Sequence, residues 1–307
     1  MPSPLRVHLA LLTVSLLFGA HFVFTKQVLG RVPANSWVFF RMAAATLVMV
    51  PIALLLRRRR TRPSGRALLW LLLASFFGIA LNQVLFTEGL VRTSPDHSAV
   101  VNSCIPTWTM LVAVLCGQER LRPRQLLAVV SALSGVLYLL GLDDMLWGDG
   151  TAFTEQTLIG DVLTAANGLV FAVHLVIMRH IGKTHTLDPW TSTAILFVQG
   201  TLLIGLWSAP TMAQAHLDAA LMTPTVWFAL YTVLAATVLT YLLNTWALRH
   251  THSSNVALYI NVQPIVAAAL NTAMGQPAPG HRFYVALLLV AGGLWLQAGG
   301  GGRRSAP

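Results

Sequence analysis

Long apolar runs separated by short polar segments follow one another along the whole chain. Each run has 17 or more residues, so an α-helix rising 1.5 Å per residue could cross roughly 30 Å of hydrocarbon. The runs lie at about residues 9–29, 36–56, 67–90, 98–117, 125–141, 158–178, 189–209, 223–247, 254–274 and 282–299. This pattern predicts an all-α polytopic membrane protein with ten transmembrane helices.

The second half of the chain repeats the first. Residues 18–26 read FGAHFVFTK and residues 171–179 read FAVHLVIMR, so His21 and His174 match at a spacing of 153 (174 minus 21), which Trp37 and Trp190 keep. At a spacing of 158 the second half matches Ala99, Pro106, Gly117, Gln118 and Gly135 with Ala257, Pro264, Gly275, Gln276 and Gly293. We therefore expect two five-helix repeats, residues 1–150 and 151–307. Because five is odd, the second repeat is inverted in the bilayer, an arrangement typical of secondary transporters.

Few polar side chains interrupt the apolar runs. Each is a candidate for function, because a polar group at membrane depth costs a few kcal/mol unless it faces protein or water. Helical spacing places His21 on a stripe with Phe18, and His174 on a stripe with Phe171, both facing the bundle interior. The other candidates for a substrate cavity are Arg41, Asn82, Glu88, Asn102, Ser103, Trp108, Asn167, Asn244 and Asn261.

The two matched histidines have more than one interpretation. Their ring nitrogens could bind substrate, or could titrate near neutral pH and couple transport to protons. Alternatively, each ring could donate one hydrogen bond to a carbonyl of a neighbouring helix and serve only packing. The sequence leaves these alternatives open.

Two charged residues at membrane depth, Glu88 and Arg41, also have alternative interpretations. Glu88 is the only carboxyl group expected well inside a span, and it could either pair with Arg92 four residues later or serve in the cavity as a proton-coupling or cation-binding group. Arg41 lies about one turn from the outer end of its predicted helix. It could extend outward to the interface, or pair with Glu88 or with an anionic substrate.

Pro106 and Pro264 fall at matched positions in the middle of their predicted helices. Each removes a backbone hydrogen bond, so kinks at symmetry-related positions would suit a gate. Ser103 and Asn261, three residues earlier, could line the cavity or satisfy the freed carbonyls. Trp108 could stack on a ring-bearing substrate or simply pack between helices.

Composition and charge support the membrane interpretation. Hydrophobic residues make up 55% of the 307 and charged residues only 10%, which excludes an ordinary soluble domain. The net charge of +10 does not indicate a nucleic-acid partner, because the basic residues follow the predicted sides of the membrane, fifteen on one side and four on the other. This bias predicts that both termini are cytoplasmic.

The chain resembles the drug/metabolite transporter superfamily and, within it, the EamA group. The resemblance covers the whole chain and is clearest from Ala99 through Pro106 to Glu119, with Gly160–Asp161 and Glu88–Leu90 as further familiar segments. The chain departs from the family at Pro277, which replaces the closing glutamate of the second repeat, and at His21, where a small or amide residue is more usual. The resemblance implies an inner-membrane carrier, often an exporter of amino acids or related metabolites, with a cavity between the two halves.

The leading interpretation is a secondary transporter, not an enzyme, whose partners are a small-molecule substrate and the lipid bilayer. The few buried charges favour a neutral or zwitterionic solute. The alternative from another class is a membrane-embedded redox protein in which His21 and His174 ligate a haem. The sequence contains no phosphate-binding glycine loop, no paired-cysteine metal site and no nucleophile elbow, so we expect no cofactor and no metal.

Overall fold

The computed structural model describes residues 4–57, 62–118, 122–147, 155–185, 187–212, 224–247 and 259–298. Every regular element in these ranges is a helix. In the first half they are α1 (Pro4–Leu29), α2 (Ala34–Leu56), α3 (Gly65–Ser75), η1 (Phe76–Leu81), α4 (Asn82–Arg92), α5 (Pro95–Asn102), α6 (Ile105–Leu115), α7 (Pro123–Leu139) and α8 (Leu142–Trp147). The second half contains α9 (Glu155–Thr184), α10 (Pro189–Met212), α11 (Thr225–Leu230), η3 (Tyr231–Leu239), α12 (Thr240–Ala247), α14 (Val262–Ala273) and α15 (His281–Ala298).

These helices confirm a polytopic membrane protein. In the described ranges, 7 helical stretches are long and apolar enough to cross a bilayer, and three shorter apolar helices cover Pro123–Leu139, Val262–Ala273 and His281–Leu296. Large apolar side chains point outward from several helices: Leu47 is 76% exposed, Leu206 76% and Leu288 73%. Such a surface is unfavourable in water and favourable in lipid. The count of ten crossings stays a prediction.

The third apolar run of each half contains a stretch of π-helix. Segment η1 joins α3 to α4, and segment η3 joins α11 to α12. The two segments begin at Phe76 and Tyr231, a spacing of 155 (231 minus 76) that falls between the two spacings of the sequence repeat. A π-helical segment leaves backbone groups out of the regular α-helical pattern and is often found at functional sites.

The helices around Pro106 and Pro264 differ from the sequence prediction. The sequence placed each proline in the middle of a helix, whereas the described helix is interrupted just before each one. Helix α5 ends at Asn102 and α6 begins at Ile105, while α14 begins at Val262. Each proline therefore lies in a first helical turn, where a missing N–H breaks no helical bond. The predicted closing residue of this region, Glu119, lies outside the described ranges.

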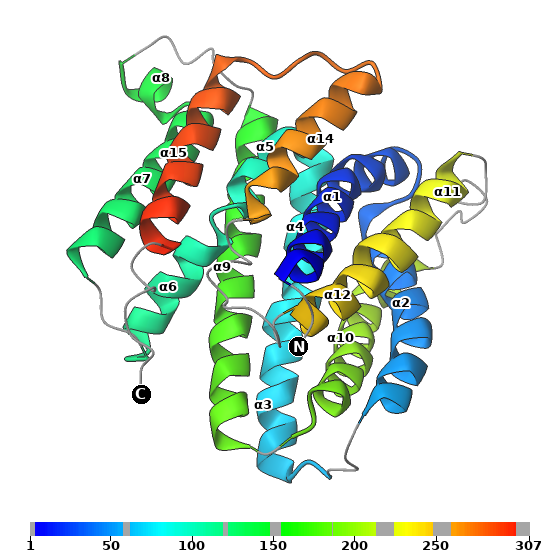
Figure 1. Cartoon of the computed structure of the whole chain (residues 1–307). Helices are drawn as coiled ribbons and strands as arrows, with labels where there is room; N and C mark the ends of the chain where they lie inside the picture. Colours follow the sequence, from blue (N-terminus) through cyan, green and yellow to red (C-terminus); the bar gives the residue numbers. More distant parts are fainter. Residues whose placement is uncertain are drawn as a thin grey trace.

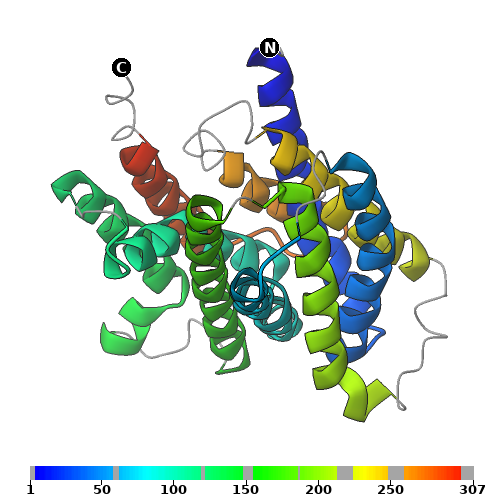
Figure 2. The same cartoon turned by 90° about the horizontal axis from the view of Figure 1, so that it is seen from below.

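Matched helices of the two halves make matching contacts with their neighbours. Helix α1 packs on α14 and α12, and its counterpart α9 packs on α6 and α4. The other two large interfaces, α2 with α10 and α7 with α15, join matched helices of the two halves. Figures 1 and 2 show α7 and α15 on one flank, α2, α10 and α11 on the other, and α9 between them.

Two matched glycines let α7 and α15 approach each other closely. A Cβ atom on Gly135 would lie 2.9 Å from the backbone oxygen of Ala286, and one on Gly293 would lie 2.6 Å from that of Ala128. Small residues let helix backbones approach in this way within membranes. Gly135 and Gly293 therefore allow the close packing of α7 against α15.

Candidate functional site

Helices α1, α2 and α4 bring a polar group together inside the apolar bundle. We call it the central cluster: His21 and Thr25 of α1, Arg41 of α2 and Gln83 of α4. His21 is 4% exposed, Arg41 2% and Thr25 0%. Arg41 donates through Nη1 to Nε2 of His21 at 3.2 Å and through Nη2 to Oε1 of Gln83. Thr25 Oγ1 lies 3.1 Å from Nδ1 of His21.

The hydrogen bonds of the central cluster determine where the His21 proton resides. A guanidinium can only donate, so Nε2 of His21 must be the acceptor. The ring is then neutral with its proton on Nδ1, where Thr25 Oγ1 can accept it. Phe86 stacks on the ring with centroids 5.5 Å apart, and Phe18 meets its edge at 6.0 Å.

Arg41 has no carboxylate partner among the described residues, and its Nε is buried without a hydrogen-bond partner there. Of the alternatives for Arg41, extension to the interface does not occur, because its side chain is only 2% exposed. A pair between Arg41 and Glu88 is also not formed. Glu88 instead pairs with Arg92 at 2.6 Å, and both side chains are about one-third exposed.

The second matched histidine has different surroundings. His174 Nδ1 donates to the backbone oxygen of Ala74 at 2.8 Å, and Phe171 stacks on the ring with centroids 5.4 Å apart. This is the interhelical packing bond that was one of the alternatives for these histidines. The residue 153 positions after Arg41 is Ala194, so no guanidinium faces His174 from the matched place.

Asn82 and Asn167 join α4 to α9. The Asn82 amide donates to the backbone oxygen of Asn167 at 3.3 Å, and the Asn167 amide donates to the backbone oxygen of Asn82 at 2.8 Å. Both side chains are buried. Asn82 follows directly after η1, so this pair holds the junction where the π-helix returns to α-helix.

The remaining candidates are not part of the central cluster. Asn102 and Ser103 each donate to a carbonyl four residues earlier in their own helix. Trp108 packs on Gly168 of α9. Asn244 has a buried Oδ1 without a partner among the described residues. Asn261 occupies the N-cap position of α14, but its side chain makes no capping hydrogen bond there. The structure therefore brings His21, Phe18 and Arg41 together. Asn82 adjoins this cluster, because Gln83 donates through Nε2 to Asn82 Oδ1 at 3.2 Å. The other candidates lie elsewhere.

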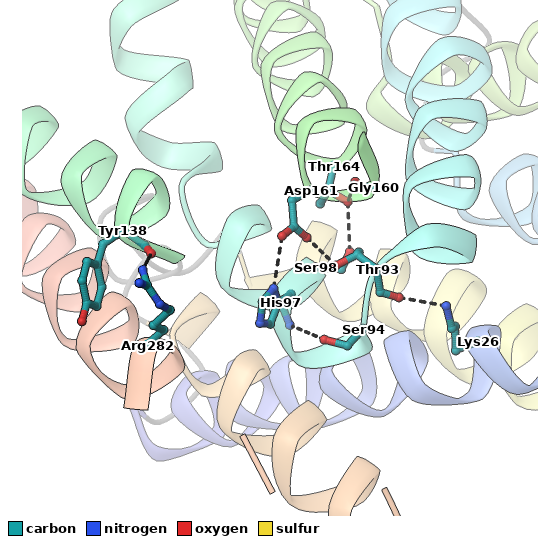
Figure 3. Close-up of polar contacts among 10 residues, drawn as sticks. All are labelled: Lys26, Thr93, Ser94, His97, Ser98, Tyr138, Gly160, Asp161, Thr164 and Arg282. Carbon is teal, nitrogen blue, oxygen red and sulfur yellow. Dashed lines mark hydrogen bonds and ion pairs between the residues drawn. The ribbon is translucent and has the colours of Figure 1, made fainter. Parts of the chain in front are cut away.

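A second polar group, which the sequence did not predict, ties the ends of four helices together (Figure 3). We call it the end latch: Lys26, Thr93, His97 and Asp161. Lys26 of α1 donates through Nζ to the backbone oxygens of Leu90, Val91 and Thr93 at 2.6, 2.8 and 2.8 Å. These carbonyls end α4, so the ammonium caps them and complements the helix dipole.

Asp161, near the start of α9, completes the end latch. Its side chain is 1% exposed, accepts a hydrogen bond from Thr93 Oγ1 and lies 3.1 Å from Nδ1 of His97 (Figure 3). Glu88 is thus not the only carboxyl group in a span, because the more deeply buried one is Asp161. The signal was present in the sequence as an acid near the start of an apolar run.

The described residues do not favour haem binding. Nε2 of His21 accepts from Arg41 and Nδ1 contacts Thr25, so no ring nitrogen of His21 remains to ligate iron. In the described ranges, no group of three or more His, Cys, Asp and Glu side chains is placed to hold a metal ion.

Comparisons with known proteins agree with the helical architecture. The family model described as "EamA-like transporter family" matches residues 5–141 and again 158–298. The chain is 23% identical to the uncharacterized transporter YyaM of Bacillus subtilis (strain 168), covering 94% of this chain and 92% of that protein. It is 24% identical to an uncharacterized transporter of Archaeoglobus fulgidus, covering 86% and 87%. A WAT1-related protein of Arabidopsis thaliana is 23% identical over 74% of this chain and 59% of its own length.

A solved structure titled "Crystal structure of protein" has the same overall fold. It superposes with a TM-score of 0.58 over 96% of this chain and 97% of its own, at 20% sequence identity.

Proposed function

This chain belongs to the EamA-like transporter family and is a membrane transporter, and we propose that it moves small metabolites by alternating access around a site between its two halves. The solutes are amino acids or related neutral or zwitterionic compounds, and the direction is export. The protein resides in the inner membrane with both termini in the cytoplasm, as the asymmetry of basic residues favours.

The observation that carries this proposal is the central cluster. Four polar side chains, one of them a guanidinium, converge from α1, α2 and α4 in a bundle whose outer surface is apolar. Helix packing alone does not explain such a group, because burying a polar side chain costs free energy unless hydrogen bonds replace those it made to water. In a transport site, a bound polar solute supplies these replacement hydrogen bonds.

The duplicated architecture supports an alternating-access mechanism. We assign residues 1–150 and 151–307 to two inverted repeats of five membrane-crossing helices each. The family model matches once in each half, the π-helical segments occupy corresponding places, and the helix contacts recur on exchanging the halves. Inverted repeats can adopt two related arrangements that open one site to either side of the membrane in turn.

The parts that move are the interrupted helices. The breaks before Pro106 and Pro264 leave α6 and α14 free to tilt against α5 and against the segment before Asn261. The end latch joins α1, α4, α5 and α9 at one end of the bundle. In our proposal the latch holds that end closed, and transport requires it to separate.

The first experiment compares metabolites in the medium of cells that overproduce the wild type or the double variant His21→Ala, His174→Ala. Enrichment with the wild type alone is the expected result and identifies the exported solute. The matched control is His281→Ala, which removes an exposed histidine at the start of α15. Equal enrichment by the double variant would show that the histidines are not part of the transport site. No enrichment by the wild type would exclude export.

Coupling to protons is tested on the same solute in membrane vesicles. An imposed pH gradient should change the rate of transport if a proton moves with or against the solute. A rate that ignores the gradient assigns the driving force to the solute gradient alone.

A further inference from the structure

Arg41 lies deep in the bundle. It is the eighth residue of α2, which begins at Ala34, so its Cα lies roughly 10 Å along the helix from the first residue. Its side chain is 2% exposed. The positive charge is therefore removed from water, and a buried charge is normally neutralised by a partner of opposite sign.

No such partner is present among the described residues. The two groups that accept from Arg41, His21 and Gln83, are neutral. Glu88 pairs with Arg92 and Asp161 with His97, and none of the ion pairs among the described residues involves Arg41. A guanidinium has five N–H donors, and the hydrogen bonds of Arg41 to His21 and Gln83 use two of them, with Nε buried and without a partner among the described residues.

The second half of the chain argues against a purely structural role for Arg41. Its matched position holds Ala194, and the matched histidine, His174, binds a backbone carbonyl instead. Since this half folds into corresponding helices without a buried guanidinium, the fold itself does not require one. The charge is a feature of the first half alone.

We propose that Arg41 binds the carboxylate of the transported solute. This assignment rests on the proposed transport function and narrows its substrates to carboxylate-bearing solutes. The unused Nε–H and a free N–H of an Nη group can hold the two carboxylate oxygens in the side-by-side geometry typical of arginine. His21 and Gln83 hold the guanidinium in place, and the rings of Phe18 and Phe86 beside His21 offer apolar surface to the rest of the solute.

The test compares acids with their amides as ligands of the purified full-length protein. Thermal unfolding is measured with a panel of L-amino acids and 2-hydroxy acids, each beside its own carboxamide. At least one acid should raise the unfolding temperature of the wild type while its carboxamide does not. This comparison needs no variant, so it stands even if a variant fails to fold.

Variants then assign the effect to Arg41. Arg41→Gln should weaken binding of that acid by about 10- to 100-fold, and Arg41→Lys should lose less because it keeps the charge. Arg66→Gln removes an exposed arginine at the start of α3 and should bind as the wild type does. Equal binding of acid and amide, unchanged binding by a folded Arg41→Gln, or no binding of any acid would overturn the assignment. The metabolite comparison reports on transport independently, so a wild type that exports a neutral solute and binds no acid would refute only the role of Arg41.

Discussion

Asn82 and Asn167 are joined by two reciprocal hydrogen bonds, each side-chain amide donating to the backbone carbonyl of the other residue at 3.3 and 2.8 Å. The bonds cross from α4 to α9 at the end of a π-helical segment. Backbone groups that lack a regular helical partner must find one within the protein at membrane depth. The pair therefore fixes both the register of the two helices and the position of the irregular segment.

We expect Asn167→Ala to lower the free energy of unfolding by about 1–2 kcal/mol, because it removes the hydrogen bond that the Asn167 amide donates to the Asn82 carbonyl across the two helices. Asn102→Ala is the matched control, since that amide binds only a carbonyl of its own helix and its loss should matter less. Chemical unfolding in detergent micelles measures both. Equal losses would mean that the reciprocal pair does not stabilise the contact of α4 with α9.

The two matched histidines should respond differently to substitution. His21→Ala removes a partner of Arg41 and should slow transport at least about tenfold, because the guanidinium loses its fixed orientation. His174→Ala removes one hydrogen bond to Ala74 and should lower stability by about 1 kcal/mol with a smaller effect on transport. Transport assays and unfolding of the single variants test this. A larger transport defect in His174→Ala would reverse the assignment.

Asp161→Asn should destabilise the end latch. The substitution keeps the shape of the side chain but removes the charge that faces His97, so we expect a loss of about 1–3 kcal/mol in unfolding free energy. Glu155→Gln, at the exposed start of the same helix, is the control and should change stability by less than about 0.5 kcal/mol. Similar changes in unfolding free energy for the two variants would show that the end latch does not stabilise the fold.

The ion pair of Asp143, in α8, with Arg282 should make stability depend on pH. The hydrogen bond from Arg282, 2.5 Å long, lowers the pKa of the Asp143 carboxyl group below its ordinary value. A lowered carboxyl pKa stabilises the fold at pH values above the pKa of the unfolded chain, about 3.9, and this stabilisation is lost as the pH falls through the folded pKa. The unfolding temperature of the wild type should therefore exceed that of Asp143→Asn at neutral pH. The gap should close in acid, and a gap independent of pH would contradict the ion pair.

Two adjacent glycines of α15 offer a test of the contact with α7. A Cβ atom on Gly293 would lie 2.6 Å from the backbone oxygen of Ala128, whereas one on Gly292 would meet only Ser131 Oγ at 4.0 Å. Gly293→Ala should destabilise the protein by about 1–3 kcal/mol because the helices must separate. Gly292→Ala should be neutral or slightly stabilising, since alanine favours the helix. Unfolding measurements that rank the two variants the other way would show that α7 and α15 do not pack as described.

Much of the candidate site could be listed from the sequence but not assembled from it. His21, Arg41, Asn82 and Asn167 stand out as polar positions in apolar runs. The sequence did not predict their hydrogen-bond partners, because hydropathy does not show how a helix is rotated about its axis or which neighbouring helix it contacts. For the same reason the sequence left several alternatives open for Arg41: extension to the interface, or a pair with Glu88 or with an anionic substrate.

The helix breaks before Pro106 and Pro264 show a similar limit. A proline within an apolar run is compatible both with a kinked helix and with a second helix that starts there, since both arrangements tolerate the absence of its N–H. Which of the two forms depends on the surroundings of the freed carbonyls. Contacts between helices, not the local sequence, set those surroundings.

The amino-acid sequence by itself determined that this protein is a duplicated helical membrane protein resembling the EamA group, because the length of apolar runs and the spacing of matched residues are properties of the chain alone. Only the tertiary structure decided that His21 faces a guanidinium while His174 binds a backbone carbonyl, and that Asp161 joins Thr93 and His97. These pairings arise where helices distant in sequence meet, and their hydrogen bonds depend on the position and rotation of each helix against its neighbours.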